Sequence, residues 1–354
     1  KDLTSAIHKL KMKHVWDIVY NHWGDQHKLF KVLPDSNWIH WHSNFTKTNY
    51  RAETIMDPYA SNFDKNTMSN GWFDNHMPDL NQQDPHLALY LIQNSIWWIE
   101  SAQIDAFRID TYSYPDQLFM SKLNQAIKLE YPKLFCFGET WVQGSPIQAW
   151  YTQSNRLNTS FNSYLDAVTD FQLFYAITKG LNENFGWEEG LRRIELTLAH
   201  DYLYDNPENL VTFLDNHDLP RIYSVLNENL NKWKMAHALL LTTRGIPCIY
   251  YGTEILMTGF CNPDAHVREE FPGGWKDHNL NLFNQINLNS NQQIAYNFLQ
   301  KLMNYRKENT WMSNGELKQF VPQDNTYAYA RIDKQGKKAL LCLFNLNPEN
   351  YKYS

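Results

Sequence analysis

The sequence predicts an α/β protein built around a parallel sheet, and three observations support this fold class. Apolar segments of strand length alternate with amphipathic helical segments over most of the chain. Several strand segments end on a carboxylate, an amide or an imidazole. From Leu317 onward the pattern changes to short segments in which apolar and polar residues alternate, as is typical of strands. Repeated strand–helix alternation forms either a doubly wound sheet or a (β/α)8 barrel.

The first part of the chain contains three predicted strands and three predicted helices. The strands are expected at residues 14–20, 104–110 and 133–138. The helices are expected at residues 3–13, 86–102 and 116–130. In the segment 86–102 the apolar residues recur at helical spacing, so this helix should bury one face.

A long polar segment separates the first two strands. Residues 23–83 are rich in aromatic side chains and show no sustained period. The segment is too long for an ordinary loop, so we interpret it as a functional region or a small subdomain. Its Trp38, Trp41 and Trp72 suit stacking on sugar and local packing equally well.

The second part continues the alternation and then becomes β-rich. Helices are expected at residues 145–155, 163–181, 187–203, 229–243 and 291–308. Strands are expected at residues 210–214 and 246–251. Three short strands are expected at residues 317–322, 326–332 and 338–345, with a turn at 334–336.

Length, charge and cysteine usage exclude several protein classes. The 354 residues allow one large domain and a smaller one. The net charge of −6 argues against a nucleic-acid binder. No run of about 18 apolar residues is present, so no membrane-spanning helix is predicted. The four cysteines are widely spaced and form neither a metal-binding pair nor an obvious disulfide framework, so they leave the compartment open.

The ends of the predicted strands carry the candidate functional residues. Arg108 and Asp110 lie two apart and so point to one face of a strand. A cation beside a carboxylate keeps it ionised, which suits a nucleophile, although a structural ion pair has the same pattern. Further polar residues at strand ends are Asp17, Asn21, His22, Glu139, His217 and Asp218. Because catalytic residues of a barrel gather at the carboxyl ends of its strands, the set together favours an active site.

Three acidic residues on three separate strands suit the cleavage of a glycosidic bond. A retaining glycosidase needs an ionised nucleophile and a protonated carboxyl group as general acid. Asp110 has Arg108 beside it, whereas Glu139 follows an apolar run, and apolar surroundings raise the pKa of a carboxyl group. Asp218 could then stabilise the developing cation.

In four ordered motifs the chain resembles the alpha-amylase family of glycoside hydrolases (family 13). The motif aspartate-x-valine-x-asparagine-histidine matches residues 17–22, and phenylalanine-arginine-x-aspartate matches 107–110. The motif glycine-glutamate-x-tryptophan matches 138–141, and phenylalanine-x-x-asparagine-histidine-aspartate matches 213–218. Each motif alone is weak or moderate, but the ordered set is highly specific and extends over nearly the whole chain.

The resemblance implies a role for each candidate residue. Asp110 is implied as the nucleophile, Glu139 as the general acid/base and Asp218 as the transition-state stabiliser. Substrate-binding roles are implied for His22, Arg108, His217, Trp141, Asp17 and Asn21.

The subgroup is narrowed by further segments. Residues 77–81 resemble the extra motif of neopullulanases and cyclomaltodextrinases, and residues 268–275 also resemble that subgroup. Residues 245–247 and 250–254 resemble the family's usual eighth-strand segment. The implied substrates are α-1,4-glucans such as starch oligosaccharides, cyclodextrins and pullulan.

The implied fold is a (β/α)8 TIM barrel lacking its first two strands in this chain. An inserted domain B and the start of a C-terminal β-sandwich accompany it. The implied domains are residues 1–22 (helix two and strand three), 23–83 (domain B), 84–312 (barrel strands four to eight) and 313–354 (incomplete C-terminal β-domain). Because the first motif already begins at Asp17, we expect a piece of a longer enzyme that folds poorly or is inactive in isolation.

No cofactor is required by the implied chemistry, and calcium remains open. Asn21 matches a calcium-ligand position of many amylases, but an asparagine there can equally be a hydrogen-bonding residue at a strand end. The histidine ligand expected after the third motif is not evident at 141–150. The expected partner is an α-glucan or a maltooligosaccharide, with no nucleic acid and no membrane span. A homo-oligomer stays open for the full-length protein, and the resemblance favours a bacterial periplasm over the cytoplasm.

Other activities fit the same motifs. A transglycosylase or branching-type enzyme uses the same covalent intermediate, and an α-1,6-glucosidase uses the same acids on another linkage. A non-catalytic glucan-binding or transporter-associated relative is a further alternative. Since such relatives usually lose one or more of the acids, the presence of Asp110, Glu139 and Asp218 argues against it.

Overall fold

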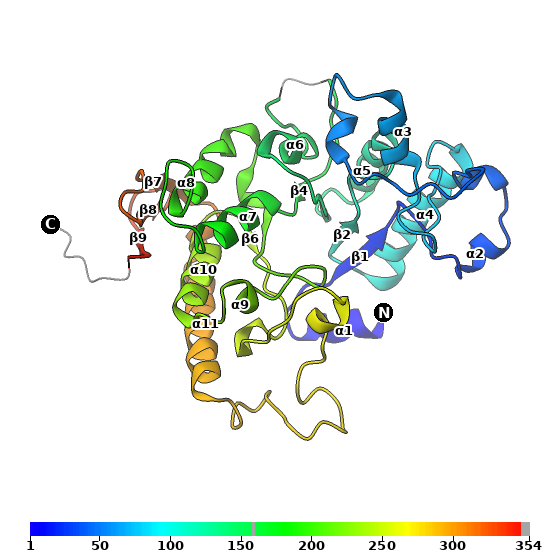
Figure 1. Cartoon of the computed structure of the whole chain (residues 1–354). Helices are drawn as coiled ribbons and strands as arrows, with labels where there is room; N and C mark the ends of the chain where they lie inside the picture. Colours follow the sequence, from blue (N-terminus) through cyan, green and yellow to red (C-terminus); the bar gives the residue numbers. More distant parts are fainter. Residues whose placement is uncertain (158–159, 348–354) are drawn as a thin grey trace. The chain divides into compact units, whose positions relative to one another are not determined.

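The computed structural model describes residues 1–157 and 160–347, which belong to two compact units. The first unit comprises Lys1–Thr169 and Tyr202–Asp205. The second comprises Asp170–Asp201 and the residues from Asn206 onward. Figure 1 shows the whole chain coloured along the sequence, and each unit is described by itself below.

A parallel four-stranded sheet organises the first unit. Its strands are β1 (Val15–Val19), β2 (Ala106–Asp110), β3 (Phe135–Gly138) and β4 (Ala167–Val168), in that spatial order. The register pairs Asp17 with Arg108 and Ile109 with Gly138. Because all four strands run in parallel, their carboxyl ends lie at one edge of the sheet.

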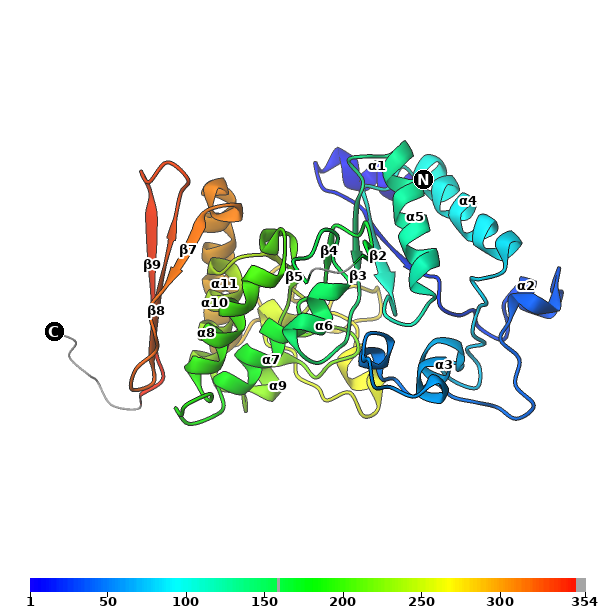
Figure 2. The same cartoon turned by 90° about the horizontal axis from the view of Figure 1, so that it is seen from above.

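The structure describes six α-helices in the first unit, within residues 1–157 and 160–169. They are α1 (Asp2–Lys9), α2 (Lys28–Lys31), α3 (Asn62–Asn70), α4 (Pro85–Ala102), α5 (Gln117–Glu130) and α6 (Ser145–Trp150). The side chain of Asp84 caps α4, and Pro85 occupies its first turn, where no intrahelical N–H donor is needed. Leu87, Leu91 and Ile99 lie on its buried face. Figure 2 shows α4 and α5 side by side next to β2.

The long segment between β1 and α4 folds without a strand of the sheet, among the residues described. It contains α2, α3 and short 3-10 turns, joined by isolated bridges such as His22 to Asp79. The backbone N–H of Leu80 donates to the carbonyl of Asn21 at 2.9 Å. The segment therefore returns to the carboxyl end of β1.

The second unit combines helices with two small sheets. Its helices are α7 (Phe171–Gly180), α8 (Leu191–Ala199), α9 (Ile222–Val225), α10 (Leu230–Thr242) and α11 (Ser290–Glu308). Strands β5 (Val211–Thr212) and β6 (Ile246–Pro247) pair in parallel. Strands β7 (Glu316–Gln319), β8 (Thr326–Ile332) and β9 (Ala339–Asn345) form an antiparallel sheet. The fully buried Trp233 of α10 packs in one core with Leu299 of α11 and Tyr329 of β8.

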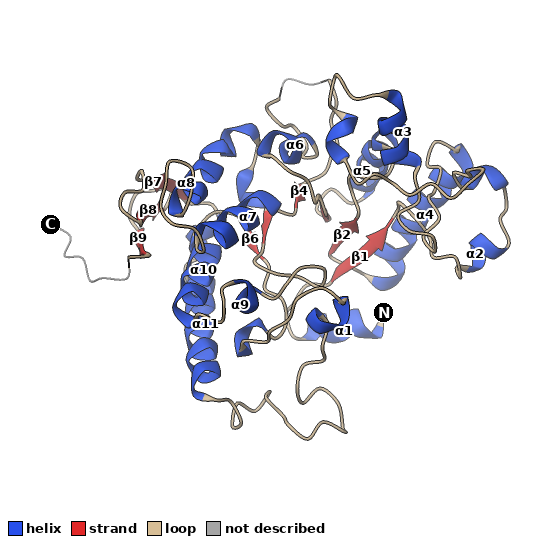
Figure 3. Ribbon diagram, in the orientation of Figure 1, coloured by secondary structure: helices blue, strands red, loops and turns tan. Residues whose placement is uncertain are grey.

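The predicted fold class is confirmed. Figure 3 shows helices alternating with short parallel strands, followed by the antiparallel sheet that was expected near the end of the chain. The parallel strands number six in the described residues, in sheets of four and two. In the same residues, no helix combines the length and apolar character that a membrane crossing requires.

One predicted helix is wrong in its first half. Residues 163–181 were expected as a continuous helix, but β4 lies within this range and α7 starts only at Phe171. The buried side chain of Asp170 accepts a hydrogen bond from the backbone N–H of Leu173 and caps α7 there. The predicted domain limits stay predictions, and the last residues of the fourth domain, 348–354, lie outside the described residues.

Candidate active site

Three carboxylates of the first unit surround one guanidinium group. Arg108 Nη1 lies 2.9 Å from Asp17 Oδ1 and 2.5 Å from Asp110 Oδ1. Arg108 Nη2 lies 2.8 Å from Glu139 Oε1. The Arg108 side chain is only 13% exposed, so it bridges the acids largely out of solvent. Four of the predicted site residues are thus brought together on β1, on β2 and directly after β3.

The backbone pairing of β2 with β3 sets the positions of the two proposed catalytic acids along the sheet. Ile109 pairs with Gly138, so Asp110 and Glu139 each follow a paired residue at the carboxyl end of the sheet. The N–H of Glu139 donates to the carbonyl of Ile109 at 2.8 Å, and the N–H of Tyr112 donates to the carbonyl of Glu139 at 3.0 Å. These bonds fix both acids on rigid backbone rather than on a free loop.

The electrostatics of the cluster favour full ionisation of the arginine. Burial alone would lower the pKa of Arg108, but Glu139, Asp110 and Asp17 outweigh burial and raise it. The surroundings of Glu139 differ from the expectation of an apolar pocket. Its buried carboxylate contacts the Arg108 guanidinium rather than apolar side chains alone.

Thr111 is a residue of this site that the sequence did not reveal. It follows Asp110 with a φ of 46°, in the left-handed region that β-branched residues rarely occupy. Its N–H donates to Glu139 Oε2 at 3.2 Å. The turn thereby aims a backbone donor at the acid, and strained backbone of this kind is typical of functional sites.

His22 is placed as a neutral hydrogen-bond donor. The amide of Asn21 donates to His22 Nδ1 at 3.2 Å, which leaves the ring proton on Nε2. Burial lowers the pKa of His22, an effect that the nearby Asp110 partly opposes. Its ring stacks on Phe73 with a centroid separation of 5.3 Å. The imidazole therefore keeps a fixed orientation, with its proton on Nε2.

Trp141 lines a cavity of about 440 Å³ in the first unit. The other lining residues are Tyr50, Arg51, Glu53, Phe73, Tyr114, Val142 and Gln143. Since Trp141 is 42% exposed, its ring can contact a molecule in the cavity. Tyr114 interacts electrostatically with both Glu139 and Asp110, so this cavity neighbours the acids.

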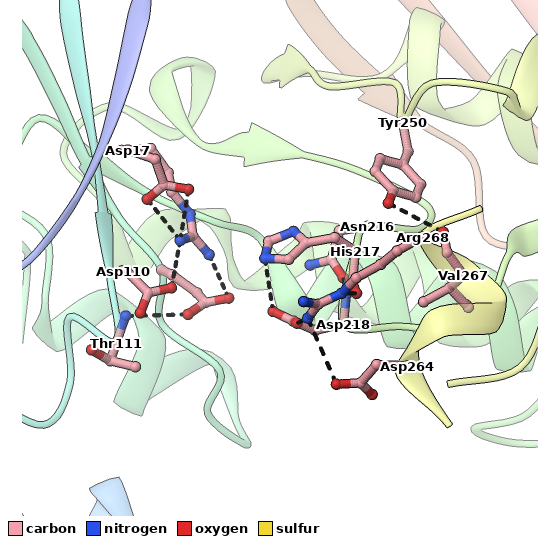
Figure 4. A network of polar contacts seen from close by, with 12 residues as sticks. Asp17, Asp110, Thr111, Asn216, His217, Asp218, Tyr250, Asp264, Val267 and Arg268 are labelled. Carbon is pink, nitrogen blue, oxygen red and sulfur yellow. Dashed lines mark hydrogen bonds and ion pairs between the residues drawn. The ribbon is translucent and has the colours of Figure 1, made fainter. Parts of the chain in front are cut away.

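In the second unit, Arg268 holds the two predicted residues of the fourth motif. Arg268 Nη2 lies 2.6 Å from Asp218 Oδ1, and Arg268 Nε donates to the carbonyl of His217 at 2.8 Å (Figure 4). His217 Nε2 lies 3.2 Å from Asp218 Oδ2. The Asp218 carboxylate is thus bound on both oxygens while remaining 30% exposed.

Two tyrosine hydroxyls anchor the segment that carries Arg268. Tyr250 donates to the carbonyl of Val267 at 3.2 Å, and Tyr251 donates to that of Glu269 at 2.7 Å. Sequence reasoning assigned residues 250–254 to the family's eighth-strand segment and residues 268–275 to the subgroup, and it missed the contact between Arg268 and Asp218. Nothing in local sequence spacing connects residues that lie 50 positions apart.

Asp215 makes the stability of the second unit depend on pH. Burial raises its pKa from 3.8 to about 6, against hydrogen bonds from the Ile222 N–H and the Thr253 hydroxyl. The folded state therefore binds the proton more tightly than the unfolded state. As the pH rises from about 4 to about 6, the stabilisation from the protonated Asp215 is lost. The free energy of unfolding falls by about 3 kcal/mol in total over this range.

We expect Asp215→Asn to remove that part of the pH dependence. Asparagine keeps the acceptor for Ile222 but cannot ionise. Denaturant unfolding of both proteins at pH 4 and pH 7, followed by far-UV circular dichroism, measures the difference. A stability difference between wild type and variant that is equal at the two pH values would contradict this assignment.

Comparison with known proteins agrees with the geometry. The family profile described as alpha-amylase, catalytic domain, matches residues 1–315. A cyclomaltodextrinase of Geobacillus thermopakistaniensis is 26% identical over 353 residues, covering 99% of this chain and 54% of that protein. A beta/alpha-amylase of Paenibacillus polymyxa is 26% identical over 356 residues, covering 98% of this chain and 26% of that protein.

Solved structures show the same fold. An alpha-amylase from Geobacillus thermoleovorans, complexed with acarbose, matches with a TM-score of 0.77 and 25% identity, covering 98% of this chain and 69% of that chain. A cyclomaltodextrinase matches with a TM-score of 0.72 and 21% identity, covering 97% of this chain and 53% of that chain. The chain spans about half the length, or less, of the two relatives by sequence named above. With the family profile matched over most of its length, the chain belongs to the alpha-amylase family.

Proposed function

We propose that this chain carries the catalytic acids of a retaining glycoside hydrolase. It would cleave α-1,4-glucosidic bonds of starch-type oligosaccharides, cyclodextrins or pullulan. The observation that carries the proposal is the convergence of Asp110 and Glu139 on Arg108, at the carboxyl ends of adjacent parallel strands. The names of the relatives, a cyclomaltodextrinase and amylases, support the substrate class.

The proposed chemistry proceeds in two balanced steps. The Asp110 carboxylate attacks the anomeric carbon, while the protonated Glu139 gives its proton to the glycosidic oxygen, and the shortened glucan leaves as an alcohol. Glu139, now ionised, takes a proton from water, and the hydroxide oxygen displaces Asp110 from the anomeric carbon. Two inversions give net retention.

Each contact of the site fits a part of this sequence. Arg108 contacts Asp110 and orients its carboxylate for attack, and the N–H of Thr111 holds the Glu139 carboxylate in place. The neutral His22 donates from Nε2 to a sugar hydroxyl. Asp218, with His217 beside it, is proposed as the transition-state stabiliser on the strength of its motif.

Nuclear magnetic resonance of early products tests this proposal. Maltotriose or β-cyclodextrin is incubated with the full chain, and the anomeric signals are followed before mutarotation. Release of α-anomeric sugar supports a retaining glucosidase. Initial formation of the β-anomer would exclude a retaining mechanism, and no reducing sugar from any α-glucan would refute hydrolysis by this chain.

Sugar transfer is a second candidate activity, and the aromatic cavity favours it. Tyr50, Tyr114 and Trp141 offer ring faces to an acceptor sugar near Glu139. An acceptor held there would compete with water for the covalent intermediate. Chain-lengthened products from maltotriose would indicate transfer, whereas glucose and maltose alone would indicate hydrolysis.

The proposed reaction requires no cofactor, but two buried oxygens suit a calcium ion. Asn21 Oδ1 and Asp79 Oδ1 have no hydrogen-bond partner, among the residues described. An isolated bridge pairs the backbone of Asp79 with that of His22, the residue after Asn21. Burial raises the pKa of Asp79 well above its usual range, and a bound cation would favour the ionised form. No three His, Cys, Asp or Glu side chains form a metal site within residues 1–157 and 160–347.

We expect added calcium to raise the melting temperature by roughly 2–4 °C, the effect of about 1 kcal/mol of binding energy. Chelation should reverse the rise, and Asp79→Asn should abolish it by removing the anionic ligand. Differential scanning calorimetry in calcium, magnesium and chelator measures these shifts. An equal calcium-induced rise in melting temperature in wild type and Asp79→Asn would place the ion elsewhere. No rise in either protein would show that calcium does not bind.

A further inference from the structure

An exposed cluster of aromatic rings in the first unit is unused by the proposed reaction. We define the aromatic patch as Phe30, Trp41, Phe45 and Trp72. The centroids of Trp41 and Trp72 lie 5.9 Å apart, as do those of Phe30 and Trp41, and those of Phe45 and Trp72 lie 6.0 Å apart. Trp41 and Phe45 are each 52% exposed, so part of each ring is accessible to a ligand.

The indole rings of the patch are held in fixed orientations. Trp41 Nε1 donates to the carbonyl of Ser36 at 2.8 Å, and Trp72 Nε1 donates to that of His40 at 2.7 Å. The backbone of Trp72 also pairs with the segment that follows Phe45, through bonds of 3.0 and 2.9 Å to Thr46 and Thr48. Both indole N–H donors are satisfied internally, so only ring faces remain to contact a ligand.

Three polar residues separate Trp41 from Phe45 in the chain. His42, Ser43 and Asn44 are exposed and lie between Trp41 and Phe45 in the chain. Exposed hydrogen-bonding groups therefore accompany the apolar rings in this segment, which gives it an apolar and a polar division. A sugar matches this division, because each pyranose has an apolar C–H face and a rim of hydroxyl groups.

The tilt between the rings selects among glucans. The planes of Trp41 and Trp72 are inclined by 58°, and those of Phe45 and Trp72 by 74°. Coplanar rings suit a flat β-1,4-linked chain, whereas inclined rings suit a curved chain whose successive sugar faces turn. An α-1,4-glucan has this curvature.

We propose that the aromatic patch is a non-catalytic binding site for an α-1,4-glucan chain. The choice of glucan rests on the proposed function, since a polymeric substrate extends beyond the catalytic centre. The patch would hold the polymer near the enzyme and raise the local concentration of cleavable bonds. Short oligosaccharides would gain nothing from it.

Affinity electrophoresis in native gels tests the proposal independently of turnover. The full chain carrying Glu139→Gln is run in gels containing amylopectin, dextran or hydroxyethyl cellulose. Further substitutions Trp41→Ala and Phe45→Ala remove patch rings, and Trp187→Ala is the matched control, a tryptophan that is 91% exposed outside the patch. Circular dichroism melts establish that each variant is folded.

We expect amylopectin to retard the parent and the Trp187→Ala control equally. Each loss of a patch ring should weaken amylopectin binding roughly three- to tenfold. Trp41→Phe, which keeps a ring, should retain most of the retardation. In the protein that keeps Glu139, Trp41→Ala should not change the turnover of a short chromogenic maltooligosaccharide. Failure of catalysis and failure of the patch therefore give different results.

Several results would overturn the site. Unchanged retardation of Trp41→Ala and Phe45→Ala would exclude the patch, as would a parent that amylopectin does not retard. Stronger retardation by hydroxyethyl cellulose than by amylopectin would reject the α-1,4 assignment. Self-association in sedimentation velocity that disappears with Trp41→Ala, without loss of glucan binding, would assign the patch to a second copy of the chain.

Discussion

Asp110→Asn is expected to lower kcat by roughly four orders of magnitude or more, because it removes the proposed nucleophile while preserving shape. Glu139→Gln should cost roughly 10²- to 10⁴-fold, the usual contribution of a general acid–base residue. Initial rates of reducing-sugar release from maltotriose measure both effects. Asp105→Asn is the matched control, since Asp105 lies just before the same strand but binds His8 and Lys13.

Azide distinguishes the two proposed roles. With Asp110→Ala and an α-maltosyl fluoride substrate, azide should attack from the vacated side, displace fluoride and give a β-glycosyl azide. With Glu139→Ala the covalent intermediate still forms on Asp110, and azide should displace it to give the α-glycosyl azide. Exchanged stereochemistry between the variants would reverse the assignment, and full activity of Asp110→Asn would eliminate it.

Arg108→Met is expected to lower both activity and stability. The variant leaves Asp17, Asp110 and Glu139 together without the cation that all three contact. Breaking a buried charge network by removing one partner costs about 3–5 kcal/mol, and we expect the lower end because Asp17 is 56% exposed. Loss of a preorganised charged group beside the reacting atoms should reduce kcat/KM by roughly 10²- to 10³-fold.

The pH profile separates these two effects of Arg108. Without the guanidinium, crowded carboxylates take up a proton more readily, so the acidic limb of the kcat/KM profile should move to higher pH. Arg108→Lys should recover part of the melting temperature but little activity, since one ammonium cannot span three acids in a fixed geometry. An unshifted acidic limb in Arg108→Met, with a normal melting temperature, would show that the ion pairs are incidental.

The sequence predicted the elements whose signals are local. The helix expected at 86–102 begins and ends within one residue of the prediction, because its apolar residues recur at helical spacing. The strand that carries Arg108 and the strand that ends just before Glu139 were both predicted, because in each case an apolar run ends on a charged residue. β4 was missed because Ala167 and Val168 form too short a run for strand and helix to be distinguished.

The contacts of the site depend on pairings that a sequence does not contain. The approach of Arg268 to Asp218 follows from the path of a loop, and the left-handed turn at Thr111 follows from the packing around it. The expected apolar setting of Glu139 was inferred from its neighbours in sequence, whereas Arg108 reaches it from the neighbouring strand. Residue types and strand ends were therefore predictable, but their partners were not.

The pairing of β1 with β2 also determines when the site can form during folding. Asp17 and Arg108 lie 91 positions apart, and the whole segment between them must close as a loop before the strands meet. Contacts of such high sequence separation are formed slowly, because the entropy of closure is lost before the contact is gained. Until then each acid remains hydrated and separate. Catalytic competence should therefore be acquired as a late event in folding, after the local helices α4 and α5 have formed.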